Sequence, residues 1–178
     1  MRQLLIAISA LVTVSLPAQQ SRYRDTLFHV LTVRDVTYGS ALSIKTNQMM
    51  DLKMDVYTPT GDPASDRPAV VLVHGGGFTS GSKTHAYLGP LGRALASRGY
   101  VAVSIDYRLR PSSPTSYADR LPAIYDLKAA IRYLRRNARR LGIDVERIAC
   151  LGSSAGAYMC LETAYGSSGP GNSGNPGY

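Results

Sequence analysis

The stretch "ACLGSSAGAY", residues 149–158, decides the fold that the sequence predicts. It continues the strand-like stretch that begins at Ile143 and places Gly152-Ser153-Ser154-Ala155-Gly156 before a helix-forming segment. Glycines on both sides of a serine let a strand and a helix pass closely at a tight turn. The stretch therefore predicts a strand, a sharp turn at Ser154 and a helix.

This turn also predicts chemistry. A G-x-S-x-G turn between strand and helix strains the serine backbone and projects its hydroxyl above the sheet. The N–H of Ala155, at the start of the helix, would point toward negative charge that develops on a reacting atom. Ser154 is therefore a candidate nucleophile and Ala155 a candidate oxyanion donor, with Gly152 and Gly156 as structural supports. From the pentapeptide alone, a plain turn with a helix-capping serine is the alternative.

A second glycine-rich stretch, "VVLVHGGGFTSGS", spans residues 70–82. Its apolar start predicts a strand buried on both faces. In a parallel sheet the loop after this strand and the Ser154 turn leave the same edge, where ligands bind in open α/β sheets. We therefore expect the N–H groups of Gly76 and Gly77 to donate to the oxygen of an ester carbonyl attacked by Ser154. A plain glycine-rich turn is the structural alternative.

The rest of the pattern predicts an α/β fold. Strands are expected at 28–39, 50–59, 69–73, 100–109 and 143–151, and helices at 85–99, at 117–142 and after Ser154. The first two strands alternate and are joined by turn residues, which predicts an antiparallel hairpin. The alternation of strands and helices that follows predicts a mostly parallel sheet, with the hairpin at its edge.

Composition limits the class of protein. The chain has 178 residues, of which 44% are hydrophobic and 18% charged, as expected for a single globular domain with a core. The formal charge of +8 raises the question of a nucleic-acid partner. The basic residues do not interleave with aromatic ones, and the densest group, Arg132 to Arg140, reads as the solvated face of an amphipathic helix. No nucleic-acid partner is expected.

The two ends of the chain predict its organisation. Residues 1–18 have a basic start, a short apolar run and a small residue before a polar stretch, which predicts a cleaved signal peptide. Residues 19–165 form the expected domain, and residues 166–178 read as a disordered tail rich in Gly, Ser and Pro. The mature protein is then expected to be secreted or periplasmic and not to be attached to a membrane.

The cysteines and histidines predict neither a disulfide framework nor a metal site. Cys150 falls in the strand before the Ser154 turn and Cys160 in the helix after it, and we expect both to be buried free thiols. The histidines are scattered, and neither HExxH nor CxxC occurs. No metal and no organic cofactor are expected.

The motifs "HGGGFTSGS", "DYRL" and "GSSAG", in this order, resemble the α/β-hydrolase superfamily. Within it they are similar to the esterase/lipase group related to hormone-sensitive lipase and to acetyl-xylan and feruloyl esterase-like carboxylesterases, from Met50 to Tyr165. The resemblance implies a nucleophile at Ser154, oxyanion donors at Gly76, Gly77 and Ala155, and structural support from His74, Gly75 and Asp106.

The implied function is that of an exported serine hydrolase of carboxylic esters, either small molecules or polysaccharide-linked. In this superfamily an acid and then a histidine follow the serine. After Ser154 the sequence has one acid, Glu162, expected to point away from the hydroxyl, and no histidine. His85 precedes Ser154 and is expected at the pocket rim or as a helix cap. The sequence therefore predicts a C-terminally truncated hydrolase that lacks the triad acid and histidine.

Two other functions remain open from the sequence. A serine peptidase of the prolyl-oligopeptidase type shares the G-x-S-x-G turn. A non-catalytic exported chain that binds esters or a partner is the alternative from a different class.

Overall fold

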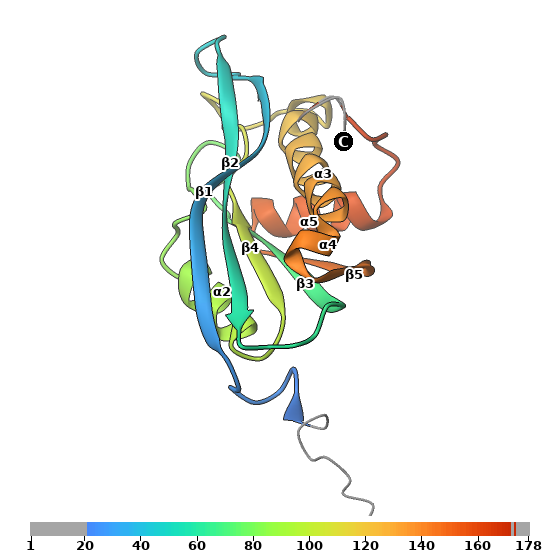
Figure 1. The fold of residues 1–178 in the computed structure, drawn as a ribbon. Coiled ribbons are helices and arrows are strands. Elements are labelled where there is room, and N and C mark those ends of the chain that lie inside the picture. The colour runs from blue at the N-terminus through green and yellow to red at the C-terminus, as the bar shows by residue number, and fades with distance from the viewer. Residues whose placement is uncertain (1–20, 172, 174–178) are drawn as a thin grey trace, which may run out of the picture.

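The computed structural model describes residues 21–171 and 173, so the expected signal peptide and most of the second half of the expected tail lie outside the described residues. These residues form one five-stranded sheet in the order β1-β2-β4-β3-β5 (Figure 1). The strands are β1 (His29–Leu42), β2 (Met49–Thr60), β3 (Arg67–Val73), β4 (Val101–Ile105) and β5 (Ile143–Gly152). β1 and β2 form an antiparallel hairpin, and β3, β4 and β5 are parallel. The predicted fold class is confirmed.

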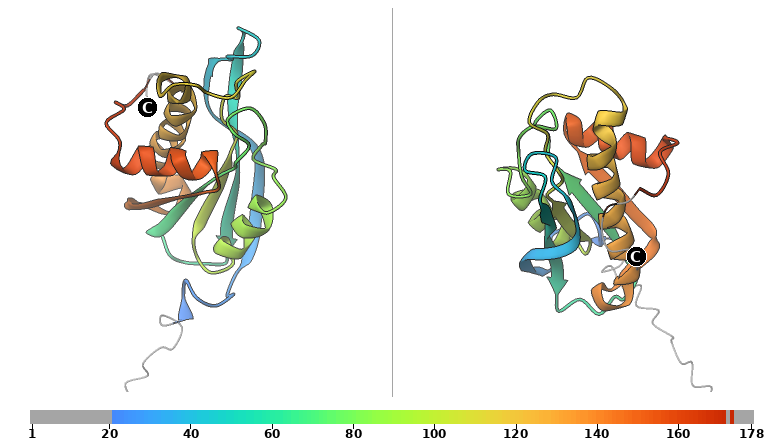
Figure 2. Two further views of the ribbon diagram at one scale, coloured as in Figure 1. Left: turned by 180° about the vertical axis from the view of Figure 1, so that it is seen from behind. Right: turned by 90° about the horizontal axis from the view of Figure 1, so that it is seen from above.

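Helices cover both faces of this sheet. They are α2 (Leu88–Ala96), α3 (Leu121–Arg136), α4 (Ala138–Leu141) and α5 (Ala155–Tyr165), with a 3₁₀ turn, η1 (Ala118–Arg120), before α3. α2 packs on one face, and α3 and α5 lie together on the other (Figure 2). Among the described residues, no helix has the length and apolar character needed to cross a membrane.

The long helix expected over 117–142 is interrupted at Asn137. The Asn137 side chain donates a hydrogen bond to the carbonyl of Tyr133, 2.9 Å away, and its backbone leaves the helical region. The backbone N–H of Asn137 bonds to the same carbonyl at 3.0 Å, so the carbonyl of Tyr133 accepts both hydrogen bonds. Gly142 then ends α4 in the left-handed conformation, as its position in the sequence predicts.

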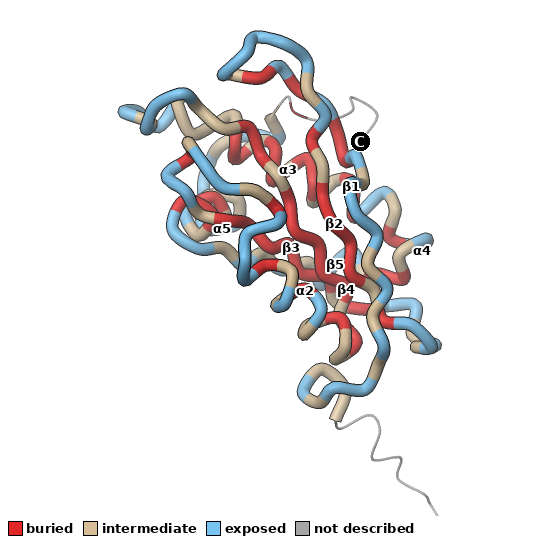
Figure 3. The backbone as a smooth tube through the Cα atoms, turned by 90° about the vertical axis from the view of Figure 1, so that its left-hand side faces the viewer, coloured by how far each residue is buried: buried red, intermediate tan, exposed pale blue. Residues whose placement is uncertain are grey.

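The central strands are apolar on both faces because both faces are covered. In β3, Val71 and Val73 contribute to the core beneath α3 and α5, whereas Val70 and Leu72 contribute to the smaller core beneath α2. Figure 3 shows the buried backbone concentrated in these strands. This double burial explains why the sequence shows an unbroken apolar run instead of alternation.

Part of the expected tail lies against α3. Lys128 donates to the carbonyls of Ser168 and Gly169, and Arg132 donates to the carbonyl of Pro170 at 2.7 Å. Arg132, expected on a solvated helix face, is therefore half-buried, and burial lowers the pKa of its guanidinium. A helical pattern of apolar residues cannot show that another segment crosses the polar face.

Candidate active site

Ser154 occupies the sharp turn between β5 and α5. Its backbone has φ +51° and ψ −118°, a conformation that residues other than glycine adopt only under strain. The residue is exposed. Hydrogen bonds hold the turn: the N–H of Ser153 donates to the carbonyl of Val73, and the N–H of Gly156 donates to that of Ser153. The hydroxyl-bearing residue is thus fixed at the carboxyl end of the sheet.

The glycines on either side of Ser154 are required by the close passage of strand and helix. A Cβ at Gly152 would lie 2.3 Å from the carbonyl carbon of Gly156. A Cβ at Gly156 would lie 2.4 Å from the carbonyl oxygen of Val73, at the end of the neighbouring strand. Real Cβ atoms do not approach backbone atoms so closely, so both positions admit glycine alone without a backbone shift. The expected close approach at this turn is confirmed.

The glycine-rich loop after β3 lies directly beside Ser154. Because β3 and β5 are parallel with Val73 opposite Gly152, their following loops emerge together. A Cβ at Gly75 would be 3.0 Å from the carbonyl oxygen of Ser153 and 3.3 Å from the Cβ of Ser154. The tertiary structure therefore brings together two motifs that are far apart in the sequence.

The backbone N–H groups of Gly76, Gly77 and Ala155, close to Ser154 in the fold, have no acceptor within the described part of the chain. Gly76 and Gly77 are exposed and have positive φ, +114° and +58°. The carbonyl of Gly76 instead accepts the N–H groups of Thr79 and Ser80, which closes the loop on itself. These N–H groups are therefore the candidate donors to a bound oxygen.

His74 is held inside the fold. The residue is buried, its ring stacks on that of Tyr107 at 4.2 Å, and its Nδ1 donates to the carbonyl of Gly75 at 2.6 Å. Burial lowers its pKa, which keeps the imidazole neutral. The Tyr107 hydroxyl donates to the carbonyl of His74. His74 thus shapes the start of the glycine-rich loop and has no contact with the Ser154 hydroxyl.

Asp106 anchors the segment that continues the glycine-rich loop. Its carboxylate accepts the N–H of Lys83 at 2.7 Å, and burial raises its pKa. Lys83 is itself buried, and its ammonium donates to Asp55 at 2.8 Å and pairs with Asp35 at 3.0 Å. Burial alone would lower the pKa of Lys83, but these carboxylates outweigh burial and raise it. The loop is thereby fastened to β2 and β4.

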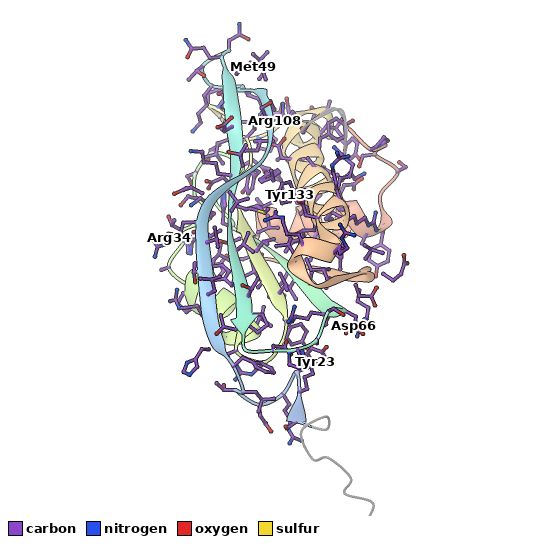
Figure 4. The ribbon with its side chains drawn as sticks, viewed as in Figure 1. Tyr23, Arg34, Met49, Asp66, Arg108 and Tyr133 are labelled. Carbon is purple, nitrogen blue, oxygen red and sulfur yellow. A yellow bond between two sulfur atoms is a disulfide. The ribbon has the colours of Figure 1, made fainter. Side chains whose placement is uncertain are left out.

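A buried ion pair supports the loop after β4. Arg108 donates from its backbone N–H and its guanidinium to Asp126, whose side chain is fully buried in α3. Arg108 lies between the β1–β2 hairpin and α3, as Figure 4 shows. A carboxylate flanked by Ile124 and Leu127 on the apolar face of a helix was the available sequence signal for this pair. Lys83 and Asp55 gave no such signal, because their partners are distant in the sequence.

Within the described residues the Ser154 hydroxyl has no hydrogen-bond partner, so none of their side chains is positioned as its base. Glu162 accepts a hydrogen bond from the Tyr117 hydroxyl at 2.5 Å. The His85 ring contacts that of Tyr87, with centroids 4.5 Å apart. Nor do the described side chains gather three or more His, Cys, Asp or Glu as a metal site would.

The expectation of free thiols is wrong: a disulfide joins Cys150 of β5 to Cys160 of α5. The turn at Ser154 folds α5 back along β5 and brings the two Cα atoms to 5.6 Å, within the range that a disulfide spans. The pairing depends on the angle between strand and helix, which the spacing of two cysteines does not give. The bridge closes a covalent loop around Ser154.

Comparison with known proteins finds a matching family and esterases that are similar to this chain. The BD-FAE family matches residues 54–170. Esterase LipI of Mycobacterium tuberculosis is 35% identical over 109 residues, which are 61% of this chain and 32% of that protein. Carboxylesterase NlhH of the same organism is 40% identical over 111 residues, again 61% of this chain and 32% of that protein. The chain thus spans about a third of the length of these relatives.

A solved structure gives the same fold. Thermogutta terrifontis esterase 2, in its form phosphorylated by paraoxon, aligns with a TM-score of 0.61 and 31% identity. The alignment covers 74% of this chain and 46% of that one. The chain therefore belongs to the BD-FAE family and has the α/β-hydrolase fold of its esterase relatives.

Proposed function

We propose that this chain carries the nucleophile and the oxyanion hole of an exported serine esterase. The observation that carries the proposal is the exposed Ser154 at a strained turn, beside the N–H groups of Gly76, Gly77 and Ala155 that have no acceptor in the described chain. The names of its esterase relatives support the same reaction class.

The reaction follows from these positions. The Ser154 hydroxyl oxygen attacks the carbonyl carbon of an ester, and the carbonyl oxygen takes up the negative charge. The N–H groups donate to that oxygen, and each such donor typically stabilises the transition state by about 3 kcal/mol. The carbon–oxygen bond to the alcohol then breaks, the alcohol leaves with a proton, and water later releases the acid from Ser154.

The proton from Ser154 needs a base. His74 does not serve, because it is buried and its Nδ1 is bonded to the carbonyl of Gly75. We therefore assign the triad histidine and its acid to a part of the protein beyond the described residues. Carboxylic esters are the substrate class, and both small and polysaccharide-linked esters suit the proposal.

Export is part of the same proposal. The apolar run near the N-terminus supports a signal peptide. The Cys150–Cys160 disulfide supports it independently, because disulfides persist in oxidising compartments outside the cytoplasm.

Acylation of Ser154 tests the proposal. The 178-residue chain is incubated with p-nitrophenyl acetate, with imidazole added to act as the base, and intact mass is recorded. We expect the mass to rise by one acetyl group in the wild type and in the neighbouring variant Ser153→Ala, but not in Ser154→Ala. Equal acetylation of the wild type and Ser154→Ala, or none in a folded wild type, would contradict the proposal.

A further inference from the structure

Two aromatic side chains border the Ser154 turn. Tyr158 lies one helical turn after Ser154, and its N–H donates to the Ser154 carbonyl at 3.0 Å. Side chains on a helix tilt toward its N-terminus, so the Tyr158 ring covers the turn that begins at Ser154. Phe78 directly follows Gly77 of the glycine-rich loop, and its ring meets that of Tyr158 edge-on, with centroids 6.2 Å apart. This aromatic pair therefore joins the helix that begins after Ser154 to the end of the glycine-rich loop.

An arginine lies over the Tyr158 ring of this pair. The guanidinium carbon of Arg120 is 5.4 Å from the centroid of the Tyr158 ring, which is partly exposed. Arg120 is the last residue of η1, and its guanidinium also donates to the carbonyl of Ser116 at 2.8 Å. A guanidinium stacked over an aromatic face and bonded to the backbone is held in place. A positive charge is thereby fixed at the border of the candidate active site.

The charge of Arg120 is not neutralised by any carboxylate among the described residues. Asp119, its neighbour, pairs with Arg110 at 2.8 Å. Glu162, on the same helix as Tyr158, accepts the hydroxyl of Tyr117 and forms no ion pair with Arg120. Arg110 therefore has a carboxylate partner, whereas Arg120 has none among the described residues.

We propose that Arg120 is a specificity-determining residue that selects esters bearing a carboxylate near the scissile bond. The inference rests on the proposed function: with the ester carbonyl between Ser154 and the N–H donors, a substrate carboxylate beyond the Phe78–Tyr158 pair meets the guanidinium of Arg120. Guanidinium and carboxylate form paired, charge-assisted hydrogen bonds, which a neutral ester of equal length lacks.

Matched esters test this inference. The acyl-side pair is p-nitrophenyl hydrogen adipate and p-nitrophenyl hexanoate, which have equal chain length; the alcohol-side pair is 4-carboxyphenyl acetate and 4-acetylphenyl acetate. Acylation rates of the whole chain are measured with imidazole present, and the rate of Ser154→Ala is subtracted. We expect Arg120→Gln to slow acylation by the charged member of at least one pair about tenfold and to leave its neutral member unchanged.

Controls separate charge from structure. Arg120→Lys should restore part of the preference, because it keeps the positive charge. Arg139→Gln removes the same charge from the exposed surface of α4, beyond the other end of α3, and should leave both rates unchanged. High salt should reduce the wild-type preference. Should Arg120→Gln fail to unfold cooperatively, this salt dependence decides, and a preference that salt leaves unchanged overturns the inference.

The outcomes distinguish the two proposals. Ser154-dependent acylation with equal Arg120→Gln effects on charged and neutral esters overturns the role of Arg120 and leaves the esterase proposal intact. Absence of Ser154-dependent acylation with every ester overturns both.

Discussion

Backbone donors at the Ser154 turn and the glycine-rich loop lack a partner, whereas the charged side chains that support the neighbouring loops are paired. At the turn, the N–H groups of Gly76, Gly77 and Ala155 have no acceptor in the described chain. In the loops that support this site, Lys83 pairs with Asp55, and Arg108 pairs with Asp126. These buried charges are thus paired within the fold, whereas the N–H groups near Ser154 have no partner among the described residues and can serve a ligand.

Removal of one buried charge should have the largest effect on stability. Asp126→Ala leaves the guanidinium of Arg108 buried without its carboxylate. We expect the free energy of unfolding to fall by about 3–5 kcal/mol, measured by urea denaturation. The double variant Arg108→Met/Asp126→Leu removes both charges and should recover much of the loss. Equal losses in the single and double variants would show that the pair is not what holds this loop.

A single methyl group at the turn should have the next largest effect. Gly156→Ala places a Cβ against the carbonyl oxygen of Val73, which forces α5 away from the sheet. We expect a loss of about 3 kcal/mol, from urea denaturation. Gly61→Ala is the matched control, since Gly61 has a positive φ of +73° but open space around it, and should cost about 1 kcal/mol. Similar losses in both variants would mean that the close passage of strand and helix is unimportant.

The smallest effect concerns a paired carboxylate far from the turn. Asp62 accepts hydrogen bonds from Arg22 at 2.9 Å and from Arg67 at 2.6 Å. Burial opposes ionisation, but these bonds outweigh it and lower the pKa of Asp62 from 3.8 to about 2. Because the folded pKa is the lower one, the stabilisation is fully present above pH 3.8 and is lost as the pH falls toward 2.

The free energy of unfolding of the wild type should fall between pH 5 and pH 2. Asp62→Asn should make this fall smaller by about 2 kcal/mol. Urea denaturation at both pH values measures it. Asp25→Asn, at the exposed pair with Arg24, should change the difference much less, because water screens that pair. An unaltered pH profile in Asp62→Asn would show that this carboxylate is not held by its two arginines.

The sequence predicted the strands and most of the helices because their signals are local. Apolar runs mark β3 and β4, and Gly142 marks the end of α4. The break at Asn137 was missed because the helical pattern of the sequence continues past it, while the backbone of Asn137 leaves the helical region.

The sequence predicted the turn and the loop that form the candidate site, but it did not predict the side chains that support them. Ser154 and the glycines carry a pattern because backbone geometry restricts which residues fit. Arg120 over Tyr158, and Lys83 between Asp55 and Asp35, carry no pattern because each contact joins segments far apart in the chain.

The sequence by itself determined the fold class, the turn at Ser154 and the glycine-rich loop, since strand burial and strained turns limit residue types locally. Only the tertiary structure decided that Gly75 lies against Ser154, that Cys150 bonds Cys160 and that Arg120 lies over the Tyr158 ring. The physical reason is that these contacts depend on the register of the strands and on the angles at which the helices pack. The same local sequence pattern is compatible with different long-range contacts.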